Sequence, residues 1–279
     1  DSDFRDDPFR RYSGSQVDEM DADQSQLSLR YFAQFNSKLD LTTTIYRNDF
    51  NRNWYKLDKV SGVSISSLLA NPNNNQAAFD IVKGADSDDD ALSVKANNRE
   101  YYSRGIQSIL GSSFNLGSSV SELEVGIRYH EDAMDRFQWV DGYRMQNGTL
   151  VLTSAGTPGT ESNRIESANA LAVFIQDKIS FDKWILTPGI RYEYIELNRK
   201  NYGNSDPERT GVDVSTKENK IDVFVPGMGI SFLASQNVNI FGGIHKGFAP
   251  PSPGSDAGTK AENSINYELG SRFNYERLG

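Results

Sequence analysis

The chain contains no cysteine and only two histidines, His130 and His245, among its 279 residues. The absence of cysteine excludes disulfides, thiolate metal sites and a cysteine nucleophile together. The two histidines are far apart in sequence and have no carboxylates at ligand spacing, which argues against direct iron coordination. We therefore predict polar strand positions for both histidines, and no cofactor.

Long apolar runs are also missing, and no segment approaches the roughly 20 apolar residues that a spanning helix requires. Hydrophobic residues make up 37% of the chain and the mean hydropathy is -0.58, which alone would suggest a soluble protein. A barrel strand, however, crosses a membrane with about 9 to 11 residues that have one apolar face. Low hydropathy therefore does not exclude a membrane β-barrel.

Basic charge is scarce, because 29 Lys and Arg stand against 38 Asp and Glu, for a net charge of -9. This balance argues against a nucleic-acid partner, whose phosphates need a basic surface. The acidic run at residues 86–90 lacks the spaced ligands and the turn glycine of a calcium-binding loop. We interpret it as solvated loop charge.

Alternation of apolar and polar residues predicts about nine antiparallel strands. In one of them Leu171, Val173 and Ile175 share a face, which we expect to point outward to lipid. The other face of the strands has charged residues and glycine, which suits a wet lumen. The predicted strands cover residues 27–35, 39–46, 102–114, 123–130, 170–179, 186–194, 223–232 and 238–245, with a ninth that opens at 266–272.

The connections between these strands alternate in length. Short turns are predicted at residues 36–38, 115–119, 181–183 and 235–237, and long polar loops at 49–98, 138–166, 199–220 and 249–263. Outer-membrane barrels have short periplasmic turns and long extracellular loops. We therefore expect residues 1–23 to form an extracellular loop. A closed bacterial barrel has an even number of strands, so nine strands imply an all-β, transmembrane antiparallel barrel of which this chain is a part.

Two other protein classes stay open on the residues alone. A soluble β-sandwich would cover the apolar face, such as that of Val125 and Ile127, with a second sheet. A passive outer-membrane porin would have no plug and a constriction of opposed charges. Catalysis is not expected, because the carboxylate pair Glu122 and Glu124 has no evident nucleophile beside it.

The segment NIFGGIHKGFAPPSPG at residues 239–254, followed by AENSINYELGSR at 261–272, is the most specific motif of the chain. With these segments the chain resembles TonB-dependent outer-membrane receptors, in particular the ferric-citrate (iron dicitrate) type. Further segments that have this resemblance are YRNDFNRNWYKLD at 46–58, GIRYHEDAMDRFQWVDGYRM at 126–145, SAGTPGTESNRIESANALAVFIQDK at 154–178 and WILTPGIRYE at 184–193.

The resemblance implies that residues 1–279 are an incomplete receptor barrel domain, part of a barrel of about 22 strands in the outer membrane of a Gram-negative bacterium. The plug domain and the first and last barrel strands would be absent. Such receptors are not enzymes. They import a ferric chelate, here ferric citrate or another siderophore-like ligand. Transport is energised by TonB with ExbB and ExbD, through the N-terminal part, and the barrel is surrounded by outer-membrane lipid.

An anionic ferric chelate needs fixed guanidinium groups, since arginine offers forked donors to carboxylates and stays charged. We predict a ligand site at Arg136, Arg144 and Arg164, with Trp139 and Tyr143 beside them, because their loop is the most motif-like. The other arginines of the predicted loops and rim are Arg47, Arg52, Arg199 and Arg209.

Overall fold

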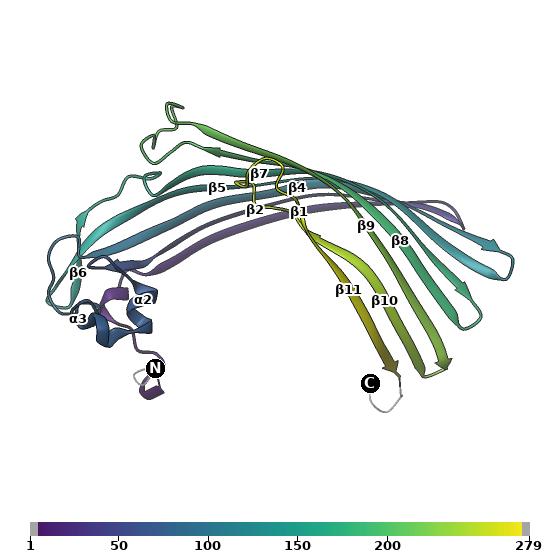
Figure 1. The fold of residues 1–279 in the computed structure, drawn as a ribbon, viewed down its shortest axis with the longest axis horizontal. Coiled ribbons are helices and arrows are strands. Elements are labelled where there is room, and N and C mark those ends of the chain that lie inside the picture. Colours follow the sequence, from purple (N-terminus) through teal and green to yellow (C-terminus); the bar gives the residue numbers. More distant parts are fainter. Residues whose placement is uncertain (1–4, 275–279) are drawn as a thin grey trace.

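The structure, a computed structural model that describes residues 5–274, is one open antiparallel sheet (Figure 1). Nine strands pair in sequence order, so each is hydrogen-bonded to the next along this path. They are β1 (Glu19–Asn36), β2 (Leu39–Val60), β4 (Leu92–Leu116), β5 (Ser119–Gln146), β7 (Ser162–Phe181), β8 (Trp184–Asn201), β9 (Ser215–Ser235), β10 (Val238–Ala249) and β11 (Glu262–Phe273). Two short strands, β3 (Val63–Ser64) and β6 (Thr149–Ser154), pair with β2 and β5.

The part of the chain that the structure describes has no helix that is long and apolar enough to cross a membrane.

All four predicted short turns are confirmed, and they lie together at the end of the sheet opposite the helices (Figure 1). Two of the predicted long loops are wrong. Residues 138–166 are largely strand, and residues 49–98 are strand at both ends with helices between them. The strands are longer than predicted because the cross-strand hydrogen bonds continue after the apolar alternation has ended. The predicted N-terminal loop also ends early, since β1 begins at Glu19, and residues 1–4 lie outside the described part.

Register divides the sheet into two faces, because directly opposed residues on neighbouring strands point to the same side. The apolar face includes the row Ile45, Ile106, Tyr129, Leu171 and Tyr194. The polar face includes the row Tyr46, Gly105, His130, Ala170 and Ile195.

The apolar face is open in the described residues. Leu171, Val173 and Ile175 are 40%, 43% and 45% exposed, and Val125 and Ile127 on β5 are comparable. A second sheet would have buried these side chains, so the structure excludes a β-sandwich.

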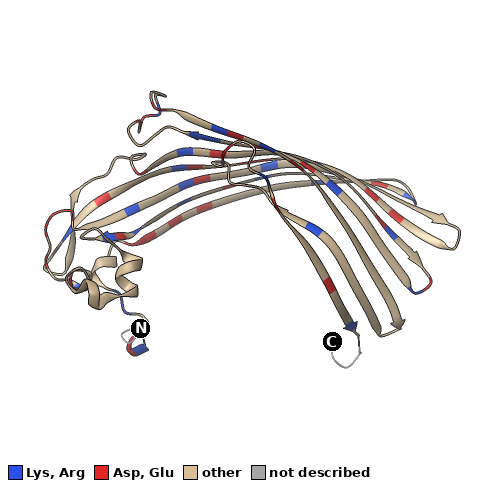
Figure 2. Ribbon diagram, viewed as in Figure 1, with Lys and Arg blue, Asp and Glu red and all other residues tan. Residues whose placement is uncertain are grey.

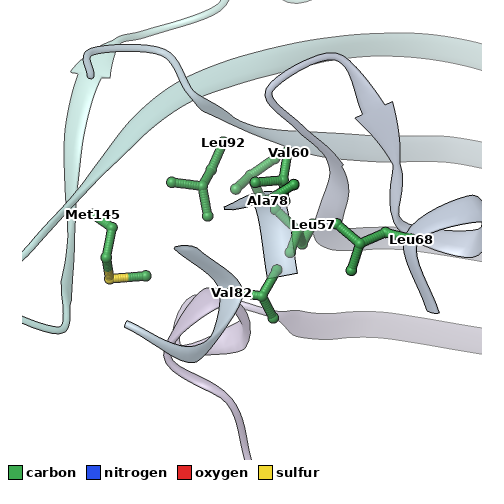
Figure 3. Close-up of a cluster of buried hydrophobic side chains, with 8 residues drawn as sticks. Leu57, Val60, Leu68, Ala78, Val82, Leu92 and Met145 are labelled. Carbon is green, nitrogen blue, oxygen red and sulfur yellow. The ribbon is translucent and has the colours of Figure 1, made fainter. Parts of the chain in front are cut away.

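A small helical insert connects β2 to β4 and has a core of its own. It consists of α2 (Ile65–Ala70), the 3-10 turn η2 (Pro72–Asn75) and α3 (Gln76–Lys83), and the 3-10 turn η1 (Ser13–Ser15) packs on α3. Ser64 caps α2 by accepting a hydrogen bond from the Ser67 backbone N–H, and Gly84 ends α3 at a φ of 119°. The buried core residues are Leu57, Val60, Leu68, Ala78, Val82, Leu92, Val94 and Met145 (Figure 3).

Candidate ligand-binding site

Four arginines stand side by side on the polar face, one on each of four neighbouring strands. Arg52 on β2 opposes Arg99 on β4, Arg99 opposes Arg136 on β5, and Arg136 opposes Arg164 on β7. We call these four residues the arginine row. Opposed residues have Cβ atoms about 4.5 to 5.5 Å apart, and like charges at that spacing repel one another. The register alone therefore concentrates positive charge at this level of the sheet.

Few acidic groups compensate this charge. Glu166 on β7 is the nearest, and its side chain is 7% exposed. Its carboxylate lies 3.6 Å from Arg136 Nε and 3.5 Å from Arg164 Nε, and it also pairs with Arg199, which opposes it on β8. One carboxylate is thus shared by three guanidinium groups. Figure 2 shows basic and acidic residues along these strands.

The other end of the row is bound by neutral donors and acceptors. Arg99 Nε donates to Asn97 Oδ1 at 3.0 Å, and its terminal nitrogen donates to the Tyr101 hydroxyl at 3.3 Å. Burial alone would raise the pKa of Tyr101, but the hydrogen bonds from Arg99 and Arg52 outweigh it and lower the pKa. These neutral groups orient the guanidinium groups without cancelling their charge.

Burial lowers the pKa of Arg136, and the charges of Arg99 and Arg164 lower it further. The Nε atoms of Arg136, Arg164 and Arg199 are buried and make no hydrogen bond. Buried polar atoms usually have a partner, so unused donors and uncompensated charge together favour a bound anion. A carboxylate-rich ligand matches both requirements.

The predicted site residues are only partly brought together. Arg136 and Arg164 are in the arginine row, but Arg144 lies eight residues further along β5 and pairs with Asp89 at 3.0 Å. Trp139 and Tyr143 alternate with Arg136 along β5, and therefore lie on the other face. Tyr143 is held there by the Tyr55 hydroxyl at 2.8 Å.

Arg99 is absent from the predicted set, and Arg52 and Arg199 were only candidates among the loop arginines. Only the pair Arg99 and Arg136 lies across a short turn, the one at residues 117–118 between β4 and β5. β2 and β4, and likewise β5 and β7, are joined by long connections, so the sequence has no local signal for the other two pairs of the row.

Both histidines lie on the polar face, as predicted. His130 Nδ1 is 2.6 Å from the Tyr46 hydroxyl, to which Arg128 donates at 2.8 and 3.1 Å. Gly105 leaves room for this contact, because a Cβ there would be 2.5 Å from the Tyr46 hydroxyl oxygen. Residues 5–274 contain no group of three or more His, Cys, Asp and Glu side chains that could hold a metal ion.

Comparison with protein families identifies the class of the chain. All of residues 1–279 match the family described as TonB dependent receptor-like, beta-barrel. The chain therefore belongs to this family, and its open sheet is part of a β-barrel.

Solved structures show the same fold. The ferric citrate transporter FecA in its unliganded form is 17% identical over 98% of this chain and 35% of its own, with a TM-score of 0.70. The siderophore receptor PiuA from Acinetobacter baumannii is 13% identical over 94% of this chain and 39% of its own, with a TM-score of 0.68. The ferric-catecholate import receptor Fiu from E. coli K12 is 13% identical over 95% and 40%, with a TM-score of 0.67. The chain thus spans about two fifths or less of the length of these proteins.

Proposed function

We propose that the chain is part of an outer-membrane receptor that imports an anionic ferric chelate, with ferric citrate as the first candidate. The arginine row is the observation on which this proposal depends, because two of its members, Arg136 and Arg164, share a single carboxylate partner with Arg199. Family membership supports a receptor rather than an enzyme. The ferric citrate transporter and the siderophore receptors among the similar structures support iron uptake as the process.

The aromatic residues of the apolar face support a membrane position. Near the short turns the rings of Trp184 and Phe232 pack with their centroids 4.4 Å apart. Further along the same strands the ring centroids of Tyr192 and Phe224 are 4.9 Å apart. The path along β8 from Trp184 to Tyr194, at about 3.3 Å per residue and a tilt of about 40°, covers a height of about 25 Å. This height matches the apolar band of an outer-membrane barrel.

The arginine row lies outside that band. Arg164 is seven residues beyond Leu171 on β7, on the side of the long connections. We infer that this end faces the outside, where a ligand would first be met. Import would then draw on TonB, which the family description names, together with ExbB and ExbD, which only the resemblance implies.

Replacing Arg136 and Arg164 by Ala in the complete receptor tests the ligand class. Charge-assisted hydrogen bonds contribute about 1.5 to 3 kcal/mol each, so the double variant should bind ferric citrate several kcal/mol more weakly. Arg144→Ala is the matched control, because Arg144 pairs with Asp89 outside the row and should leave the affinity unchanged.

Titration of ferric citrate by intrinsic fluorescence measures the affinity, and heat-modifiable gel mobility checks that each barrel is folded. Undiminished affinity in a folded Arg136 and Arg164 double variant would reject the arginine row as the site. A ferric catecholate serves as a second ligand, and stronger binding of that compound would assign a different chelate. Uptake that continues without TonB would instead favour the passive porin.

A further inference from the structure

The sheet has a split between β9 and β10. The two strands pair only from Val238 opposite Ser235 to His245 opposite Gly227. Beyond this point both strands continue without pairing to each other, and they diverge (Figure 1). Pro226 is the first residue of β9 past the last pair, and it has no N–H with which to extend the ladder. The sequence thus ends the pairing at a defined level.

The connection between β10 and β11 bridges the far part of the split on the polar face. Asn219 of β9 donates to the Thr259 carbonyl at 2.9 Å and accepts from the Gly258 N–H at 3.1 Å. Lys217 pairs with Asp256 at 2.9 Å. Asn219 and Lys217 alternate with the apolar-face residues of β9, so these contacts are all made on the polar side. These contacts therefore cover the part of the split that lies farthest from the last pair.

On the apolar face the split forms a cleft of about 630 Å³. The side chains that line it there are Pro226, Met228, Ile244, Lys246, Asn263 and Ile265. A volume of this size is ordinary for a small-molecule site. The apolar lining suits a hydrocarbon chain.

Lys246 is the one basic side chain of this lining. Its side chain is half-buried, and within residues 5–274 it forms no ion pair with a carboxylate, unlike five other lysines. Lys246 lies eight residues after β10 begins at Val238, as Tyr192 lies eight residues after β8 begins at Trp184. Both strands begin at short turns on the same rim, so the ammonium group is at the level of the second aromatic pair. A half-buried cation without a carboxylate partner favours an anion at this level.

We propose that the cleft binds a phosphate-bearing lipid of the outer leaflet, with one acyl chain packed against Pro226, Met228 and Ile244 and the phosphate at Lys246. This inference rests on the proposed membrane position of the chain, and is independent of the chelate. Hydrocarbon in the cleft buries the apolar side chains, and the phosphate compensates the lysine charge.

Native mass spectrometry of the complete receptor in detergent tests the inference. Phosphatidylglycerol is titrated into the wild type and into Lys246→Gln and Ile244→Trp variants. One lysine near a membrane surface contributes about 1 kcal/mol, so Lys246→Gln should bind about fivefold more weakly. Ile244→Trp should lose the lipid, because the indole fills the cleft. Ile240→Trp on the paired part of β10 and Lys183→Gln in a short turn are the matched controls, and should bind as the wild type does.

Diacylglycerol with the same acyl chains and inorganic phosphate are the two further probes. We expect diacylglycerol to bind at least fivefold more weakly and millimolar phosphate to leave the lipid in place. Equal retention in all variants, equal binding of diacylglycerol, or displacement by phosphate alone would overturn the proposal. Ferric citrate affinity, measured on the same folded variants, should not change, so failure of the lipid site and failure of the chelate site give different results.

Discussion

Arg136 lies where the charges of neighbouring arginines destabilise the unliganded sheet. It is opposed by Arg99 on β4 and by Arg164 on β7, and it shares the Glu166 carboxylate with Arg164 and Arg199. Repulsion between opposed like charges destabilises the unliganded sheet, and an anion that bridges the guanidinium groups would relieve it. The residues that weaken the free protein would thus be the ones that favour the proposed ligand.

Asp206 orders the connection between β8 and β9, and gives a prediction at the same scale. It is 3% exposed and accepts hydrogen bonds from the Thr210 N–H at 2.8 Å and the Gly211 N–H at 2.7 Å. Burial opposes its charge, but these bonds outweigh burial and hold the pKa of the carboxyl below its usual value. A lowered pKa contributes stability that is present above the ordinary carboxyl pKa and is lost as pH falls through the lowered value.

We therefore expect Asp206→Asn to accelerate amide hydrogen exchange at Thr210 and Gly211 at neutral pH. In the wild type the same amides should lose protection, relative to their intrinsic rates, only below about pH 4. Asp182→Asn in a short turn is the control. Unchanged protection in Asp206→Asn would show that the carboxylate does not hold this connection.

At the scale of elements, the strands extend far beyond what a bilayer requires. β5 has 28 residues, about 90 Å of chain, whereas about 10 residues cross the membrane. The extra length explains why one predicted loop, residues 138–166, is largely strand, and why another, residues 49–98, is strand at both ends. It also provides the surface on which the helical insert packs, because Leu57, Leu92 and Met145 come from the ends of β2, β4 and β5 near the insert.

The insert should unfold separately from the barrel. Leu68 of α2 is fully buried, and Leu→Ala changes at buried sites cost about 2 to 5 kcal/mol. We expect Leu68→Ala to raise hydrogen exchange throughout α2 and α3 while the amides of β7 and β8 stay protected. Leu69→Ala is the matched control, since Leu69 is 54% exposed. Loss of protection in both regions would mean that the insert and the sheet unfold as one unit.

At the scale of the whole molecule, the sheet is open, and β1 and β11 each have one neighbour. Tyr267 and Leu269 on β11 are 76% and 86% exposed. An unpaired strand edge is unfavourable in lipid, where no water satisfies the backbone. The family match agrees with this, because further strands of a larger barrel would pair with both edges.

The two faces of the sheet should respond differently to charge. Ile175 on the apolar face of β7 lies between the levels of the two aromatic pairs, whereas Gln176 points to the polar face. Arginine near the midplane on the lipid side costs about 2 to 4 kcal/mol, so Ile175→Arg should destabilise the barrel by that amount. Gln176→Arg should be nearly neutral. Urea unfolding of the complete receptor in lipid vesicles measures both, and equal costs would contradict the assignment of the faces.

The sequence by itself determined the strand order, the short turns and the two faces. Turn residues and apolar alternation act over a few neighbouring positions, and antiparallel pairing across a short turn leaves little freedom in register. Arg136, Arg144 and Arg164 were predicted together on a different ground, because their segment is the most similar to the family motif.

Only the tertiary structure decided where the strands end and which arginines meet. Outside the apolar band both faces of a strand are polar, so alternation disappears although the hydrogen-bonded ladder continues. Arg52, Arg99 and Arg136 meet because the registers of three strands add up, and the split at Pro226 depends on how β9 and β10 diverge in space. Such long-range sums have no local signal, and Arg144 was grouped with the site because only its sequence neighbourhood could be read.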